Sequence, residues 1–176
     1  METTMTLIER ATENDYQAIL DIGRISVKQA HLGSCPEEDL DEYMKGHYNA
    51  EAIQRELSNP ENIYHILYYN GKPAGFSKLV LNAAHENVEA KNSAKLDRIY
   101  ILPEYFDKKL GAELLRFSVA FVRQQAQKGV WLVTWIGNTR AINFYSKAGF
   151  KIIGSYNFQV TATTSNLNHQ MYLELG

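Results

Sequence analysis

The residues best placed for chemistry lie where a predicted strand meets a predicted helix, at Lys108 and Lys109. The run KLDRIYILPEYFDKKLGAELL, residues 95–115, starts with an apolar, β-branched stretch over residues 96–102, and this composition predicts a strand. A proline ends the stretch, and from Leu110 onward the apolar residues recur at helical spacing. The N-terminus of such a helix presents free backbone N–H groups and the positive end of the helix dipole. We therefore expect this junction to bind an anion, and a pyrophosphate in particular.

The elements around this junction predict an α/β domain. Strands are predicted over residues 5–10, 63–69, 73–81, 96–102, 130–136, 150–158 and 170–175. Helices are predicted over residues 15–33, 37–46, 50–57, 110–127 and 138–147. The dipeptide Asn70-Gly71 between the second and third strands is a strong hairpin signal. This order predicts one domain over residues 1–176, built on a mixed, mostly antiparallel central sheet of about seven strands flanked by helices.

The composition excludes several classes of protein. The chain has 176 residues, of which 45% are hydrophobic and 22% charged, and its net charge is −2. Nucleic-acid binders normally carry a basic surplus, and no apolar run approaches the roughly 20 residues that span a bilayer, so neither partner is expected. The single cysteine, Cys35, excludes an intrachain disulfide and has no partner at metal-ligand spacing. The cysteine spacing therefore predicts no metal site. Because no signal peptide is recognisable, we expect a cytoplasmic protein.

Two motifs resemble those of the GNAT acetyltransferase superfamily. RIYILPEYFDKKLGAELL, residues 98–115, is similar to the family's strand, phosphate loop and helix. NTRAINFYSKAGF, residues 138–150, matches the family pattern N-x-x-A-x-x-F-Y-x-x-x-G-F at every fixed position. With ELSNPENIY at residues 56–64 and VWLVTW before the second motif, the chain is most similar to the bacterial spermidine/spermine acetyltransferases. This resemblance implies a GNAT-like sheet in which two central strands splay apart.

The resemblance also implies where acetyl-CoA binds, as a co-substrate between the strands 96–102 and 130–136. Its pantetheine arm would pair with unpaired backbone groups as an added strand does, and one N–H would polarise the thioester carbonyl. Main-chain N–H groups of residues 107–112 would hold the pyrophosphate. The implied contacts are Ile99, Tyr100, Ile101, Asp107, Lys108, Lys109, Leu110, Gly111, Ala112, Asn138 and Tyr145. Composition alone would equally place residues 99–101 in the core.

The phosphate loop departs from the family pattern Gln/Arg-x-x-Gly-x-Gly/Ala. The three positions are Phe106, Lys109 and Gly111, and only the last agrees. Glycine lets the backbone approach phosphates without a Cβ in the way. The departure leaves open a second function, a degenerate CoA-binding or non-catalytic GNAT-like module.

Two residues are candidates for catalysis. Given its motif, Tyr145 would protonate or hydrogen-bond the thiolate that leaves when an amine attacks a thioester; otherwise it packs beside Phe144. Asp97 alternates onto the same face of its strand as Ile99 and Ile101, so it could face the cleft and is a candidate base. Alternatively, Asp97 is a solvated or salt-bridged carboxylate at the edge, and water relays the proton to bulk solvent. Asn138 is expected as a helix N-cap, to which the resemblance adds a cofactor contact. The five histidines show no spacing that singles one out.

The acceptor is expected to be a primary amine that attacks the thioester directly, without an acetyl-enzyme. The acidic run EEDLDE, residues 37–42, gives mild support for a polyamine or similar small basic amine, although such runs are usually only solvated. A peptide N-terminus or protein lysine is the alternative acceptor. A homodimer is expected only by analogy with relatives.

Overall fold

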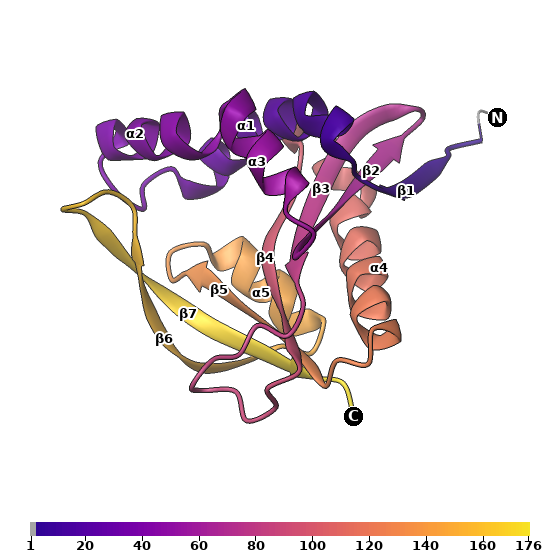
Figure 1. Ribbon diagram of the computed structural model, residues 1–176. Helices are drawn as coiled ribbons and strands as arrows, with labels where there is room; N and C mark the ends of the chain where they lie inside the picture. The colour runs from indigo at the N-terminus through magenta and orange to yellow at the C-terminus, as the bar shows by residue number, and fades with distance from the viewer. Residues whose placement is uncertain (1–2) are drawn as a thin grey trace.

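In the computed structural model, which describes residues 3–176, seven strands pair into one sheet flanked by helices (Figure 1). The strands are β1 (Thr6–Arg10), β2 (Asn62–Tyr69), β3 (Lys72–Val80), β4 (Ser93–Ile101), β5 (Gly129–Trp135), β6 (Lys151–Gln159) and β7 (Ser165–Glu174). The helices are η1 (Glu13–Asp15), α1 (Tyr16–His31), α2 (Glu37–His47), α3 (Ala50–Ser58), η2 (Pro103–Lys108), α4 (Leu110–Gln124) and α5 (Thr139–Lys147). The sheet order is β1-β2-β3-β4-β5-β7-β6, and among the described strands only β4 and β5 are parallel neighbours. The predicted mixed, mostly antiparallel sheet of seven strands is therefore confirmed.

Local sequence explains the β2–β3 hairpin. Asn70 and Gly71 both adopt positive φ, 48° and 77°, as a tight turn between twisted antiparallel strands requires. The Asn70 side chain also accepts a hydrogen bond from the backbone N–H of Met5 at 2.9 Å, which ties the start of the chain to the turn. The turn therefore sets the register of β2 against β3.

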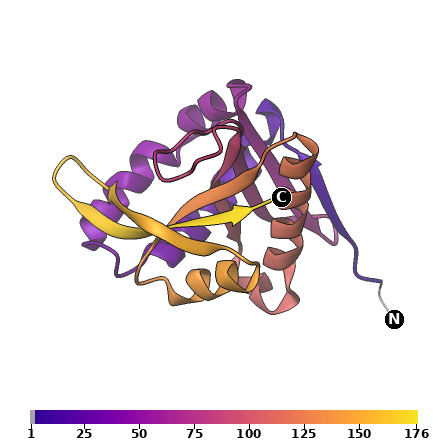
Figure 2. The same ribbon diagram turned by 90° about the horizontal axis from the view of Figure 1, so that it is seen from below.

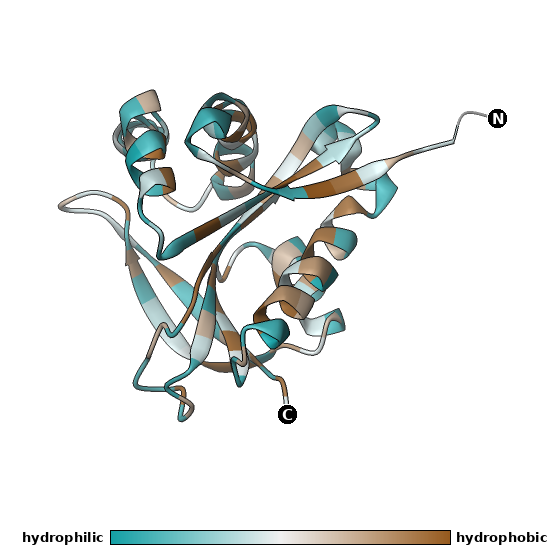
Figure 3. Cartoon of the chain, turned by 45° about the vertical axis from the view of Figure 1, so that its right-hand side comes forward, coloured by the Kyte–Doolittle hydropathy of each residue, from teal (hydrophilic) through white to brown (hydrophobic). Residues whose placement is uncertain are grey.

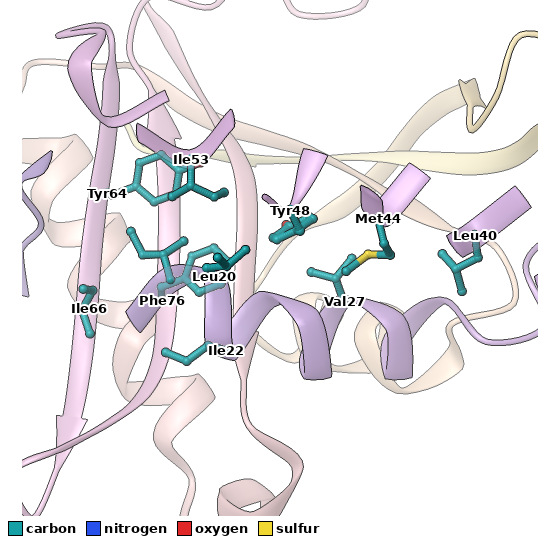
Figure 4. Packing of buried hydrophobic residues seen from close by; sticks show 11 residues of the cluster. Leu20, Ile22, Val27, Leu40, Met44, Tyr48, Ile53, Tyr64, Ile66 and Phe76 are labelled. Carbon is teal, nitrogen blue, oxygen red and sulfur yellow. The ribbon is translucent and has the colours of Figure 1, made fainter. Parts of the chain in front are cut away.

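Helices cover both faces of the strands. On one face α1, α2 and α3 bury a cluster with β2 and β3 that includes Leu20, Ile53 and Phe76 (Figure 4). On the other face α4 packs against β3 and β4 through Leu110 and Leu114. Figure 3 shows hydrophobic residues along the central strands and hydrophilic residues on the outer faces of the helices. In Figure 2 the β6–β7 hairpin projects from the side of the molecule opposite β1. None of the helices within residues 3–176 has the length and apolarity to cross a membrane.

The parallel strands β4 and β5 separate after three residue pairs. Ser93 to Lys95 of β4 pair with Gly129 to Trp131 of β5, and beyond these residues the two strands have no common register. A β-bulge follows at once, because Leu96 and Arg98 pair with adjacent residues of β3 and leave Asp97 as the extra residue. A bulge bends its strand and increases the local twist, so β4 turns away from β5. The predicted splayed pair is confirmed (Figure 1).

Two strands begin three or more residues earlier than their composition predicted. β4 starts at Ser93 rather than at residue 96, and β7 starts at Ser165 rather than at residue 170. The polar residues of β7 form a strand because they pair with β5 on one side and with β6 on the other, which leaves Asn168 only 4% exposed. Helix α4, in contrast, ends at Gln124, two residues before Ala126 adopts a φ of 56°.

Candidate active site

The gap between β4 and β5 opens into a cavity of about 570 Å³. Its walls come from both strands, from the loop before α4, from α5 and from the C-terminal half of α1. The cavity lining includes most of the residues singled out from the sequence, namely Asp97, Ile99, Tyr100, Ile101, Lys109, Gly111, Ala112, Asn138 and Tyr145. The fold therefore brings segments 97–112 and 138–145 together around one space.

Backbone groups of Ile99 and Ile101 face the gap. The N–H of Leu102 donates to the carbonyl of Ala74 at 2.8 Å. In an antiparallel ladder the backbone groups of alternate residues point to the same neighbouring strand. The backbone N–H and C=O of Tyr100 therefore also form hydrogen bonds with β3. The residues between them present their N–H and C=O groups to the opposite edge, where β5 has turned away. The expected backbone contribution of Tyr100 is thus wrong, because its amide belongs to the sheet and it reaches the cavity with its side chain.

The N-terminus of α4 presents free donors. Within residues 3–176 the amides of Lys109, Leu110, Gly111 and Ala112 have no hydrogen-bond acceptor, and the first amide with one is that of Glu113, which donates to the Lys109 carbonyl at 3.3 Å. Four unpaired N–H groups at the positive end of a fifteen-residue helix fit an anionic group. The anion site predicted from this junction therefore has its donors in place.

Three of the expected contact residues lie outside the cavity lining. Asp107 is exposed, Leu110 is buried in the core with Leu114, and the Lys108 ammonium lies 5.4 Å from the centre of the Tyr69 ring. Their side chains are directed to solvent, to the core and to β2, so these residues have only backbone groups to offer.

Lys109 occupies the glycine position of the loop in a glycine-like conformation. Its φ of 58° and ψ of 23° are left-handed, a region that costs a residue with a Cβ about 1 kcal/mol or more. Next to it, the guanidinium of Arg140 stacks 3.5 Å from the centre of the Phe106 ring, and both residues line the cavity. Arg140 was not predicted. It adds a permanent positive charge at the mouth where the free amides lie.

Tyr145 reaches the cavity from α5, and Asn138 positions that helix. The Asn138 side chain accepts a hydrogen bond from the N–H of Ala141 at 3.1 Å, so its expected N-cap role is present. The Tyr145 ring packs between Phe144 and Phe150, with ring centres 5.3 and 5.8 Å away. Its hydroxyl has no hydrogen-bond partner among the described residues, and burial raises its pKa, so the phenol stays protonated at neutral pH.

A second cavity of about 300 Å³ adjoins the first and is lined by α2, β4 and the β6–β7 hairpin. His31 and Tyr100 line both cavities, and the His31 Nε2 lies 3.3 Å from the Tyr100 hydroxyl. Burial lowers the pKa of His31, so its imidazole is neutral at neutral pH and can accept a proton. The sequence did not indicate this residue, because its partner Tyr100 is 69 positions away.

Comparison with known proteins identifies this arrangement. The model of the acetyltransferase (GNAT) family matches residues 25–150, which include both strands of the gap. The chain belongs to this family. The prediction of a GNAT N-acetyltransferase is thereby confirmed.

Similar proteins include two named for polyamines. Spermidine N(1)-acetyltransferase of Thermoplasma acidophilum is 26% identical over 145 residues, which cover 82% of this chain and 88% of that protein. Spermine/spermidine N(1)-acetyltransferase of Bacillus subtilis is 25% identical over 152 residues, which cover 86% and 91%. The crystal structure of PaiA N-acetyltransferase from T. acidophilum in complex with coenzyme A superposes with a TM-score of 0.76 at 22% identity, over 97% of this chain and 99% of that one.

Asp97 does not share the face of Ile99 and Ile101 in this GNAT chain, so the predicted parity is wrong. The bulge shifts the alternation by one residue and turns the Asp97 carboxylate toward Lys78, 2.9 Å away, on the face of α1 and α3. Burial raises the pKa of Asp97, but Lys78, Lys95 and Arg98 outweigh burial and bring the pKa to about 2. So acidic a carboxyl is a poor proton acceptor. His31 suits that task better.

The acidic run lies outside both cavities, apart from Leu40. Glu37 and Asp41 pair with Lys28 at 3.6 and 2.8 Å, and Asp39 accepts a hydrogen bond from Thr164 at 2.7 Å. The run therefore holds α1 and the β6–β7 hairpin against α2. Its carboxylates are not placed to bind an acceptor within either cavity.

Proposed function

We propose that this protein transfers an acetyl group from acetyl-CoA to the primary amine of a small molecule, by direct attack of the amine on the thioester. The observation that carries the proposal is the meeting of two cavities at His31 and Tyr100. One cavity has an unpaired strand edge and free helix amides, and the other is lined by residues of α2 and of the β6–β7 hairpin. Figure 1 shows how these two elements lie relative to β4 and β5.

The first cavity fits coenzyme A by the chemistry of its donors. The free amides from Lys109 to Ala112 would hold the pyrophosphate, and Arg140 adds charge beside them. The exposed backbone edge at Ile99 and Ile101 would pair with the amides of the pantetheine arm. The coenzyme A complex of the structural neighbour supports this assignment of the cavity.

In the chemistry the nitrogen loses two protons and the sulfur gains one. Acetyl-CoA supplies a thioester, at which a C–N bond forms as the C–S bond breaks. An alkylammonium has a pKa of about 10.4, so a base must take one proton before attack, and we assign that task to His31. Tyr145, with a neutral and unpartnered hydroxyl, gives its proton to the departing thiolate. The second proton of the attacking nitrogen, lost as the amide forms, returns the Tyr145 phenolate to a phenol. A backbone N–H of Ile99 or Ile101 polarises the thioester carbonyl.

A polyamine is the first candidate acceptor, because several relatives carry polyamine names. The second cavity weighs against a polycation, since Lys78, Lys95 and Arg98 line it against only Glu56 and Asp97. We therefore propose the broader class of small primary amines.

A thiol-release assay with acetyl-CoA and a panel of polyamines, amino acids, aminoglycosides and peptides tests the proposal. We expect amine-dependent release of CoA and an N-acetylated product by mass spectrometry. Calorimetry with acetyl-CoA accompanies the assay. Heat of binding without release from any amine would favour the non-catalytic module, and absence of both would refute the assignment of the cavity.

A further inference from the structure

The floor of the second cavity carries more positive than negative charge. Three cations and two carboxylates line it together: Lys78, Lys95, Arg98, Glu56 and Asp97. The carboxylates are largely taken up by lysines. The Lys78 ammonium lies 2.7 Å from Glu56 and 2.9 Å from Asp97, and that of Lys95 lies 3.1 Å from Asp97.

Arg98 is the cation left without close anionic partners. Its side chain is 10% exposed, and its nearest contacts to the carboxylates of Glu56 and Asp97 are both 3.9 Å, beyond hydrogen-bond distance. Within residues 3–176 its guanidinium makes one hydrogen bond, from Nη1 to the Tyr64 hydroxyl at 3.0 Å. A guanidinium has five N–H donors, so most of them remain without an acceptor.

Within residues 3–176 the phenols that line this cavity add no negative charge to that of Glu56 and Asp97. Burial raises the pKa of Tyr43, Tyr48 and Tyr100, so all three stay neutral phenols. Tyr48 covers one face of the guanidinium, with its ring centre 5.1 Å from the Arg98 Cζ. An arginine buried in this way is costly unless its charge and donors are satisfied. The cavity therefore presents excess positive charge and free N–H donors to an anion that enters it.

We propose that the acceptor amine carries a carboxylate, which the Arg98 guanidinium binds in the second cavity. A planar carboxylate matches the guanidinium fork and neutralises the excess charge. Arg98 lines both cavities, as His31 and Tyr100 do, so an acceptor held there extends its amine toward the thioester side. This inference rests on the proposed acetyl transfer and restricts its substrates to amino acids and related amino carboxylates.

Matched acceptor pairs test the inference on the wild-type protein. L-lysine and cadaverine, β-alanine and ethylamine, and phenylalanine and phenethylamine each differ by one carboxyl group. We expect the best acceptor to be the carboxylated member of its pair, with a kcat/KM at least tenfold above that of its partner. Equal or better turnover of the decarboxylated partners, or of spermidine, would overturn the inference and leave the acetyl transfer standing. Absence of release from every amine would overturn both.

Arg98 variants give the second readout. Arg98→Gln should raise the KM for the carboxylated acceptor at least tenfold. Its affinity for acetyl-CoA, measured by calorimetry, should stay unchanged, which would show that the variant is folded. Arg98→Lys keeps the charge, loses the fork and should give an intermediate KM. Arg116→Gln on the exposed side of α4 is the matched control, with no expected change. If folded Arg98→Gln keeps the wild-type ratio of kcat/KM between the carboxylated and decarboxylated members of a pair, the role of Arg98 is refuted. If that variant does not fold, the acceptor pairs measured on the wild-type protein decide the substrate class.

Discussion

Replacing Lys109 by glycine and, separately, by alanine tests the backbone geometry of the phosphate loop. Both changes remove the same exposed ammonium, for which no ion pair is found within residues 3–176. They differ only in the Cβ, which is disfavoured at the observed φ of 58°. The difference between the two variants therefore reports the left-handed conformation itself.

The expected difference is about 1 kcal/mol in favour of glycine. A left-handed residue with a Cβ costs about 1–2 kcal/mol, and the greater freedom of glycine in the unfolded chain offsets about 0.5–1 kcal/mol of that gain. For a protein of 176 residues this corresponds to a Tm about 2–4 °C higher for Lys109→Gly than for Lys109→Ala. Thermal unfolding without ligand measures it. An alanine variant as stable as the glycine variant would refute the assigned conformation.

The same pair probes the anion site. Loss of one solvent-screened charge near a pyrophosphate is worth at most about 1 kcal/mol, so CoA should bind up to about fivefold more weakly to both variants. The proposal assigns the phosphates to the amides rather than to the side chain. Glycine favours the left-handed conformation that presents these amides, so the glycine variant should bind CoA at least as well as the alanine variant. Calorimetric titration measures both values. A loss of binding above a hundredfold in the glycine variant would show that the side chain holds the phosphates.

Three further predictions concern single side chains. Tyr145→Phe should lower kcat by about 10²-fold without changing CoA affinity, because only the thiolate loses its proton donor; unchanged turnover in stopped-flow or steady-state assays would exclude the role. Burial lowers the pKa of His31, so the acidic limb of kcat/KM should lie below the 6.5 of an unperturbed imidazole. His31→Asn should lose most activity together with this limb, and an identical limb in the variant would exclude His31. Burial, with a smaller effect of Arg10, lowers the pKa of His65 to about 4. As the pH falls, the unfolded chain therefore protonates His65 before the folded chain does. Between pH 6.5 and 4 the free energy of unfolding should decrease less in His65→Phe than in the wild type. An equal decrease in both proteins, measured by denaturant unfolding at the two pH values, would contradict this.

The motif residues illustrate what local sequence can predict. Asn70-Gly71 predicted a hairpin because both residues tolerate positive φ, and both adopt it. The N-cap at Asn138 and the free amides at the start of α4 also follow from local rules about helix ends, which act within a few residues. These predictions required no knowledge of distant parts of the chain.

The bulge at Asp97 illustrates what local sequence does not contain. Strand parity assumes unbroken alternation, and nothing in LDRIY marks the extra residue that β3 leaves unpaired. The same holds for β7, whose polar residues become a strand only because β5 and β6 lie on either side. In both cases the pairing partner decided the outcome.

By itself, the sequence determined the family, the order of strands and helices, and the segments that form the first cavity, because these depend on motifs and on periodicity along the chain. Only the tertiary structure decided that His31 faces Tyr100, that the acidic run lies outside the cavities and that Arg98 is left with excess charge. The physical reason is that a pKa, an ion pair and an unsatisfied donor each depend on residues brought together from distant positions, and sequence spacing does not carry those distances.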